Sequence, residues 1–257
     1  MVNVVYNQLK NNIREREKVD KPLINWFLLT FILSWLTFGI AFVYVFIKRI
    51  LRVDKYIRRK HEFFDMVIHF IELESNERGL DNYEEYMSSL RGRLSRFQKE
   101  VHPVMPFVIK GFLPVIIFTV FIAGYILTTG INNISNTLLI TIFLIWGIDT
   151  AVVVLIYIYK MNRIWDDVQQ FESEMYETIS HIFMSLKLKD HPLMYCTNPH
   201  IKKNFTLYVV LGFLTCGIWF IVWDYYVHTA PDKMYQVFHK AEDDTIEVVK
   251  SCCKRDE

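Results

Sequence analysis

A single carboxylate, Asp149, lies near the middle of a long apolar segment, where an ionisable side chain is unusual. A charged side chain at the centre of a bilayer costs about 2.5 to 3.5 kcal/mol, so it usually faces a polar partner or a water-filled path. Thr150 is its neighbour in the sequence. Lys110 in the preceding apolar segment is a candidate partner, although its depth in the membrane would differ from that of Asp149 by about 10 Å. Two interpretations are open: an ion or proton site, or an aspartic acid that holds helices or subunits together.

Two histidines begin matched polar patterns in which the residues are spaced by four. The patterns are His61-x3-Asp65-x3-His69 and His239-x3-Asp243-x3-Glu247. This spacing places each trio on one helical face, where imidazole and carboxylate can share a divalent metal. However, His61 borders an apolar stripe, whereas His239 points away from the stripe of its own helix. We therefore expect solvated helix faces and no bound metal or other cofactor.

A run of basic residues directly follows the first apolar segment and is a candidate contact for anionic lipid. Its members are Lys48, Arg49, Arg52, Lys55, Arg58, Arg59 and Lys60. Each such residue attracts anionic headgroups by about 1 kcal/mol near a membrane surface. The chain has a net charge of +1 and no recognised nucleic-acid-binding motif. We therefore expect membrane lipids as partners, and no nucleic acid.

Four apolar blocks must position these residues: 23–47, 107–128, 138–159 and 205–227. Each is long enough for a membrane-spanning helix, which needs about 20 apolar residues. The charged segments between them carry apolar stripes at helical spacing. One stripe runs through Ile164, Val168, Phe171, Met175, Ile179, Ile182 and Leu186, with Glu172 among the acidic residues placed on the other faces. The sequence predicts an all-α, polytopic membrane protein with a cytoplasmic helical bundle.

The first and last blocks repeat each other, because Phe27 matches Phe205 at an offset of 178 residues and the matches continue into the charged helices. The core of the repeat is Leu36, Thr37, Gly39 and Ile40, matched by Leu214, Thr215, Gly217 and Ile218. Each copy is either a straight span with glycine as a packing notch, or a broken helix that turns at the threonine and glycine and re-enters the same face.

This core looks like the short Thr-x-Gly-Ile-Tyr/Trp repeat of small prokaryotic membrane proteins of unknown function. The resemblance covers about 22–50 and 201–228, and the first copy departs from it with Ala41 at the aromatic position. It implies a membrane location and a repeat architecture. It lends no activity to either copy.

Basic residues orient the segments. The uncharged link 129–137 is expected outside the membrane, with 48–102 and 161–204 in the cytoplasm. The predicted parts are a first repeat with its basic helix (1–72), a cytoplasmic helix (73–103), a transmembrane hairpin (104–160), an amphipathic helix (161–200) and a second repeat with a cytoplasmic tail (201–257). Both termini are expected on the same side, in the cytoplasm.

The motifs of common enzyme sites are missing from the sequence. It has no glycine-rich phosphate loop, no Gly-x-Ser-x-Gly elbow and no His-Glu-x-x-His. We therefore expect a non-enzyme: a scaffold or assembly component that contacts membrane lipids and either forms a homo-oligomer or binds another membrane protein. The alternative is an oligomeric ion channel or transporter that uses Asp149.

Overall fold

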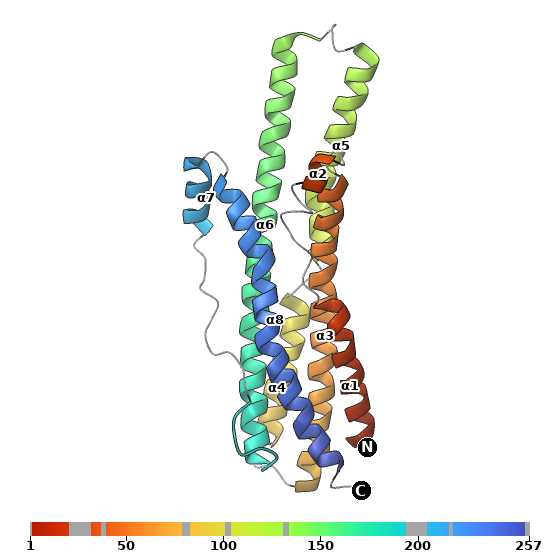
Figure 1. Cartoon of the computed structure of the whole chain (residues 1–257), viewed down its shortest axis with the longest axis vertical. Coiled ribbons are helices and arrows are strands. Elements are labelled where there is room, and N and C mark those ends of the chain that lie inside the picture. The colour runs from red at the N-terminus through yellow and green to blue at the C-terminus, as the bar shows by residue number, and fades with distance from the viewer. Residues whose placement is uncertain are drawn as a thin grey trace. The chain divides into compact units, whose positions relative to one another are not determined.

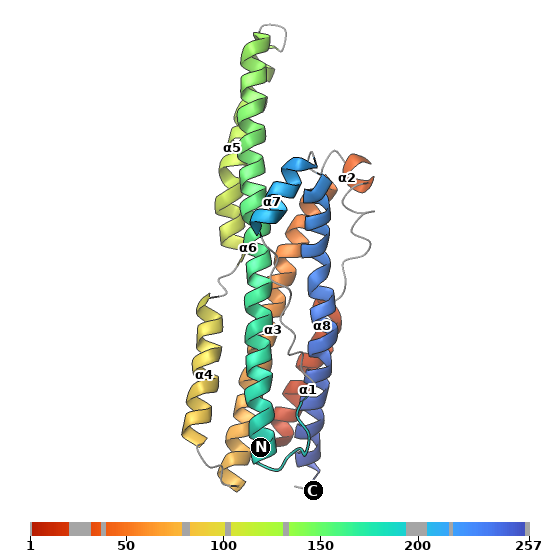
Figure 2. The same ribbon diagram turned by 90° about the vertical axis from the view of Figure 1, so that its left-hand side faces the viewer.

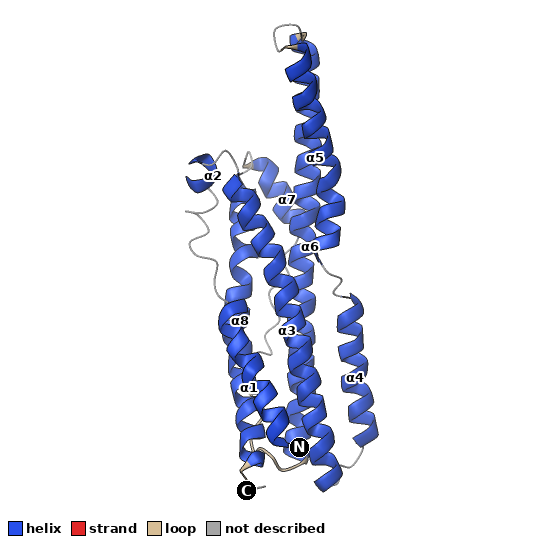
Figure 3. Ribbon diagram, turned by 90° about the vertical axis from the view of Figure 1, so that its right-hand side faces the viewer, coloured by secondary structure: helices blue, strands red, loops and turns tan. Residues whose placement is uncertain are grey.

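The computed structural model describes residues 2–20, 32–36, 40–78, 83–100, 104–130, 134–193, 205–215 and 218–254, and the regular elements within these ranges are all helices (Figures 1 and 3). They are α1 (Val2–Val19), α2 (Leu33–Leu36), α3 (Ile40–Arg78), α4 (Tyr83–Glu100), α5 (Val104–Thr129), α6 (Asn136–Ser185), α7 (Phe205–Leu214) and α8 (Ile218–Cys253). The predicted all-α class is confirmed. The chain forms two compact units: unit 1 is Met1–His102 with Ile164–Glu257, and unit 2 is Pro103–Arg163.

Unit 2 contains α5 and the first part of α6. Large apolar side chains on both helices are exposed, among them Leu113, Ile117, Phe121, Leu127, Phe143 and Ile148. Within the described residues, α6 is the helix that is long and apolar enough to cross a membrane, judged by length and composition. An exposed apolar surface of this extent is unusual for a protein surrounded by water.

Unit 1 is a helical bundle in which α3, the second part of α6 and α8 run parallel. Contacts between α3 and α8 advance together along both helices, from Arg52 and Asp232 to Lys60 and Glu242. In contrast, α1 and α4 run antiparallel to these three helices. The Asp20 carboxylate, at the end of α1, pairs with Arg59, and Phe97 near the end of α4 stacks on Phe171 of α6. Figure 2 shows the same helices from a second side.

Aromatic rings fill the space between the three parallel helices. Phe64 of α3 packs edge-on against Tyr176 of α6, and Tyr176 stacks on Phe238 of α8. Nearer the beginning of these helices, Trp165 contacts both Tyr56 and Tyr235. Edge-on and offset rings are the favoured arrangements of aromatic pairs. The predicted stripes therefore meet in one core inside unit 1.

Helix breaks fall at corresponding positions of the two predicted repeats. α2 ends at Leu36 and α3 begins at Ile40, while α7 ends at Leu214 and α8 begins at Ile218. The hydroxyl of Thr215 donates to the Leu211 carbonyl at 2.7 Å and accepts the Trp219 N–H at 3.0 Å. It therefore satisfies backbone groups on both sides of the second break. Thr37, Gly39 and Gly217 lie outside the described residues.

α7 folds back beside the first turns of α8 as an antiparallel helical hairpin (Figure 1). The ring of Phe205, at the start of α7, is 5.5 Å from that of Trp223, whereas Phe213 near its end is 5.9 Å from Phe220. A Cβ added to Gly212 would meet the Phe220 ring, so a larger residue there would require this ring to move. α2 likewise contacts α3.

Candidate functional site

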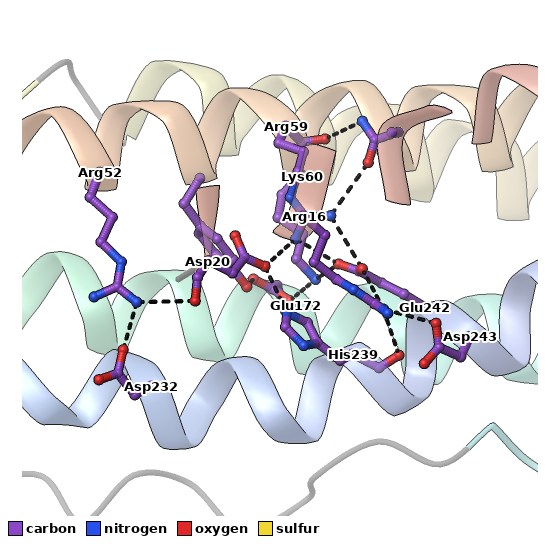
Figure 4. Close-up of polar contacts among 12 residues, drawn as sticks. Arg16, Asp20, Arg52, Arg59, Lys60, Glu172, Asp232, His239, Glu242 and Asp243 are labelled. Carbon is purple, nitrogen blue, oxygen red and sulfur yellow. Dashed lines mark hydrogen bonds and ion pairs between the residues drawn. The ribbon is translucent and has the colours of Figure 1, made fainter. Parts of the chain in front are cut away.

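Lys60 lies at the centre of unit 1 and its side chain is completely buried. Its Nζ is 2.6 Å from Glu172 Oε2 and 2.6 Å from Glu242 Oε1. Both carboxylates are also completely buried. The three residues come from α3, α6 and α8, so this buried triad joins the three parallel helices by charge (Figure 4).

Aromatic rings surround the ammonium group of Lys60. Five ring centroids lie 5.4 to 6.0 Å from its Nζ, and they belong to Tyr56, Phe63, Phe64, Tyr176 and Phe238. Ring faces attract a cation, and here they also separate it from solvent. The Tyr56 hydroxyl donates to Glu172 Oε1 at 2.5 Å, and Lys60 donates to the Tyr176 hydroxyl at 3.3 Å. Each polar group of the cage therefore meets a polar partner.

Arg59 adds a second buried cation beside the triad. Its Nη2 lies 3.0 Å from Glu242 Oε1 and its Nη1 lies 3.2 Å from Glu242 Oε2. A guanidinium that binds both oxygens of a carboxylate makes a strong, well-oriented pair. The same Nη2 is 2.8 Å from Asp20 Oδ2, at the end of α1. Glu242 is therefore shared by three cations, because Arg16 Nη1 of α1 also lies 3.4 Å from its Oε2, and Arg59 links it to Asp20 at the end of α1.

Three polar residues of α1, spaced by four, complete the cluster. Asn12 donates to the Arg59 carbonyl at 3.1 Å, and Arg16 Nη1 lies 2.8 Å from Asp243 Oδ1. Asp20 Oδ2 is 2.7 Å from His239 Nε2 (Figure 4). A spacing of four puts all three on one face of α1. This face seals the charged cluster against α3 and α8.

The two glutamates of the triad differ in proton affinity. Burial raises the pKa of a carboxyl group, but Lys60 and Arg59 outweigh it and hold the pKa of Glu242 at about 2. Burial raises the pKa of Glu172 above its usual value, against the opposing effects of Lys60 and the Tyr56 hydrogen bond. Glu242 is thus the firmly ionised partner, and Glu172 takes up a proton more readily.

This difference predicts an acid dependence of stability. The pKa of Glu242 falls from 4.5 to about 2 in the folded protein, so its stabilising contribution is complete above about pH 4.5 and is lost as the pH falls towards 2. A shift of this size corresponds to about 3 kcal/mol. Glu242→Gln should flatten the acid loss of unfolding free energy, measured by denaturant titration between about pH 5 and pH 2.5.

Glu172→Gln is the matched control for that experiment. The raised pKa of Glu172 makes the folded state bind its proton more tightly, so acid stabilises through this residue and partly offsets the loss at Glu242. Glu172→Gln should therefore steepen the acid loss. The assignment is contradicted if wild type and Glu242→Gln lose stability equally over this pH range.

The basic run predicted to contact lipid is divided by the fold. Lys48, Lys55 and Arg58 are exposed, and lipid contact stays a prediction for them. Arg49, Arg52, Arg59 and Lys60 are buried, so their guanidinium and ammonium groups are not available to headgroups. Arg52 Nη2 instead lies 2.6 Å from Asp232 Oδ1. The lipid-contact prediction is therefore wrong for these four residues, whose charges lie inside unit 1.

The histidine trios occupy different surroundings. In the first, Asp65 and His69 are exposed and His61 is half-buried. In the second, His239 contacts Asp20 and Asp243 pairs with Arg16. Over the described part of the chain, no three His, Cys, Asp or Glu side chains gather as metal ligands.

Asp149 and Lys110 are both exposed in unit 2, on α6 and α5 respectively. Within the described part of this unit they form no ion pair with each other. The backbone of Thr150 lies in α6, and its side chain is not described. One turn before Asp149, the Trp146 indole N–H donates to the Thr119 hydroxyl at 2.9 Å and links the two helices.

The buried cluster was missed in the sequence, although its signal was present. Lys60 follows Tyr56 by four residues and precedes Phe64 by four, so it lies within an apolar stripe. Glu242 follows Phe238 by four in the same way. The predicted position of Glu172 on an outer helix face is wrong, because its side chain is fully buried, four residues after the buried Val168. Charges of opposite sign within the apolar stripes of separate helices indicate a buried pair.

Comparison with known proteins adds no relative to this picture: no protein-family model, curated protein or solved structure matches the chain.

Proposed function

We propose that the chain is an integral membrane protein with a structural or interaction role, in which unit 2 is a transmembrane hairpin and unit 1 is a cytoplasmic bundle. One contrast carries this proposal. Unit 2 exposes large apolar side chains along both helices, while unit 1 encloses apolar and charged residues in its interior. The exposed apolar side chains of unit 2 are compatible with the hydrocarbon core of a bilayer, and the exposed charges of unit 1 are compatible with water.

The breaks at Leu36 and Leu214 support the predicted repeat and its re-entrant form. The repeat also relates the charges of the core, because Lys60 and Phe64 of α3 occupy the positions of Phe238 and Glu242 in α8. Each copy thus supplies one charge and one phenylalanine, in opposite order. This complementarity favours two repeats that pair with each other in a polytopic chain of four apolar segments, the central two of which join the repeats.

The arrangement of unit 1 supports termini on the same side of the membrane. α1 begins where α8 ends, at one end of the bundle (Figure 1). Both termini then share the cytoplasmic side with the charged helices. The resemblance to prokaryotic membrane repeat proteins agrees with a membrane location.

A scaffold role is favoured over transport because the charged cluster is sealed. Lys60, Glu172 and Glu242 are paired with one another and shielded by rings. Buried ion pairs of this kind select one arrangement of helices more than they add stability. In unit 2, Asp149 has no described polar partner at its depth that would continue a pathway, so we assign it to contacts between copies of the chain.

Substitutions of Asp149 separate assembly from transport. Asp149→Asn keeps size and hydrogen bonding, so oligomers in native mass spectra should persist. Asp149→Leu should weaken association by about 1 kcal/mol, while the control Val152→Leu, at another exposed position of α6, should not. Vesicles that contain wild type should show no ion flux. Flux that disappears in Asp149→Asn would replace the scaffold with a channel or transporter.

A further inference from the structure

The two helix breaks of unit 1 form apolar tips that its core does not cover. At the tip of the α7–α8 hairpin, Leu214 is 75% exposed and Phe213 is 70% exposed, and Ile218 is exposed beside them. At the corresponding tip of α2 and α3, Leu36 is 72% exposed. Leu36 and Leu214 are matched residues of the predicted repeat. Both copies therefore present large apolar side chains where one helix ends and the next begins.

The two tips lie at the same end of unit 1. α3 and α8 run parallel, and each begins at its tip. Figures 1 and 2 show α2 and α7 at this end, while the termini lie at the other. One partner or one surface at this end of unit 1 could therefore cover both tips.

The length of α7 corresponds to half of a bilayer. α7 has 10 residues, which is about 15 Å at 1.5 Å per residue. The hydrocarbon core of a bilayer is about 30 Å thick, so α7 reaches the midplane and no further. The hairpin then returns along α8 to the face that it entered. Such a tip occupies one leaflet.

Residues suited to the membrane surface stand at equal distances from both tips. Tyr226 is exposed eight residues after the start of α8, and Lys48 is exposed eight residues after the start of α3. These positions correspond in the repeat and lie about 12 Å from the helix starts. The Lys48 ammonium is 5.4 Å from the Tyr44 ring. Tyrosine and lysine both favour the boundary between hydrocarbon and headgroups.

We propose that unit 1 inserts both apolar tips into one leaflet of a lipid bilayer and thereby bends the membrane. The half-depth α7–α8 hairpin, with the apolar α2 tip at the same end, enlarges the area of the leaflet it enters and leaves the opposite leaflet unchanged, so the membrane becomes convex on the side of unit 1. Amphipathic segments that insert only into the boundary between headgroups and acyl chains are sensitive to membrane curvature for the same reason. The inference rests on the proposed membrane location and adds a role in membrane shape.

The test uses the full chain reconstituted into vesicles of phosphatidylcholine and phosphatidylserine, imaged by electron cryomicroscopy. The mean vesicle diameter should fall as the protein-to-lipid ratio rises. The double variant Phe213→Ser with Leu214→Ser changes only exposed side chains and should lose at least half of this effect. The control Phe121→Ser with Leu127→Ser makes similar changes at exposed positions of unit 2, where Phe121 is 69% exposed, and should keep it.

Alkaline extraction of the same vesicles separates this inference from the proposed function. Protein that leaves the vesicles at high pH would refute the membrane location itself. Protein that stays embedded without changing vesicle diameter would overturn the curvature role alone. The curvature role is also overturned if the tip variant reduces vesicle diameter as much as wild type does. It is overturned as well if the variant changes only the native oligomer mass, because a second copy of the chain then covers the tips.

Discussion

Replacing Lys60 by methionine is expected to lower the unfolding free energy of unit 1 by about 3 to 5 kcal/mol, the usual cost of breaking a buried ion pair. Methionine fits the aromatic cage but leaves Glu172 without its cation and Glu242 with Arg59 and the more distant Arg16. The matched control is Lys55→Met, at an exposed position of the same helix, which should change stability by no more than about 0.5 kcal/mol. Denaturant unfolding of both variants measures the difference.

A compensating substitution tests whether the loss comes from unpaired charge. In Lys60→Met with Glu172→Leu, the carboxylate that depends most on Lys60 is removed with it. Buried ion pairs can often be exchanged for apolar residues of similar volume without loss of stability, so the double variant should recover most of the free energy. If the double variant is no more stable than Lys60→Met, packing and not charge explains the role of Lys60.

Arg59→Met should release α1 from the bundle. Its guanidinium joins Asp20 of α1 to Glu242 of α8, and all three side chains are buried. Its loss leaves two buried carboxylates with weakened pairing, at a cost of about 3 to 5 kcal/mol. Hydrogen exchange of the α1 amides should accelerate more than that of α6, because α1 depends on this contact.

The neighbouring Arg58 provides the control for Arg59. It is exposed, and among the described residues it pairs with Glu62, four residues later on the same helix. Such surface pairs contribute about 0.3 to 0.5 kcal/mol. Arg58→Met should therefore leave the exchange of α1 unchanged. Equal acceleration in both variants would show that total positive charge, and not the internal position of Arg59, holds α1.

The helices of the charged segments could be predicted because their apolar residues recur at helical spacing. Asn76 and Gly79 interrupt the apolar pattern in the sequence, and α3 ends between them at Arg78, before α4 begins at Tyr83. α1 was not predicted, because its polar residues conceal a short stripe. That stripe consists of Val2, Val5, Leu9 and Asn12, which the fold buries. Its spacing of three and four is the signal that was available.

The apolar stripes signal that Lys60 and Glu242 are buried, but the pairing of charges in the cluster could not be predicted from local patterns. Lys60, Glu172 and Glu242 each have charged or polar neighbours in the sequence. The sequence therefore predicts lipid contact for Lys60 and an outer helix face for Glu172, and it makes no prediction for Glu242. Their partners come from other helices, more than 60 residues away. Only tertiary packing determines which charges meet and lose their water. The candidate lipid site was divided for the same reason, because a run of basic residues on a helix faces in all directions.

The most direct test of the account is the side of the membrane on which each unit lies. With the four native cysteines replaced, single cysteines are introduced at Ser135, exposed beside the start of α6, and at Ser95, exposed on α4. A membrane-impermeant maleimide is then applied to cells that express each variant. Ser135→Cys should be labelled in intact cells and Ser95→Cys only after the membrane is opened. Labelling of Ser95→Cys in intact cells, or protection of Ser135→Cys there, would contradict a hairpin that crosses the membrane above a cytoplasmic bundle.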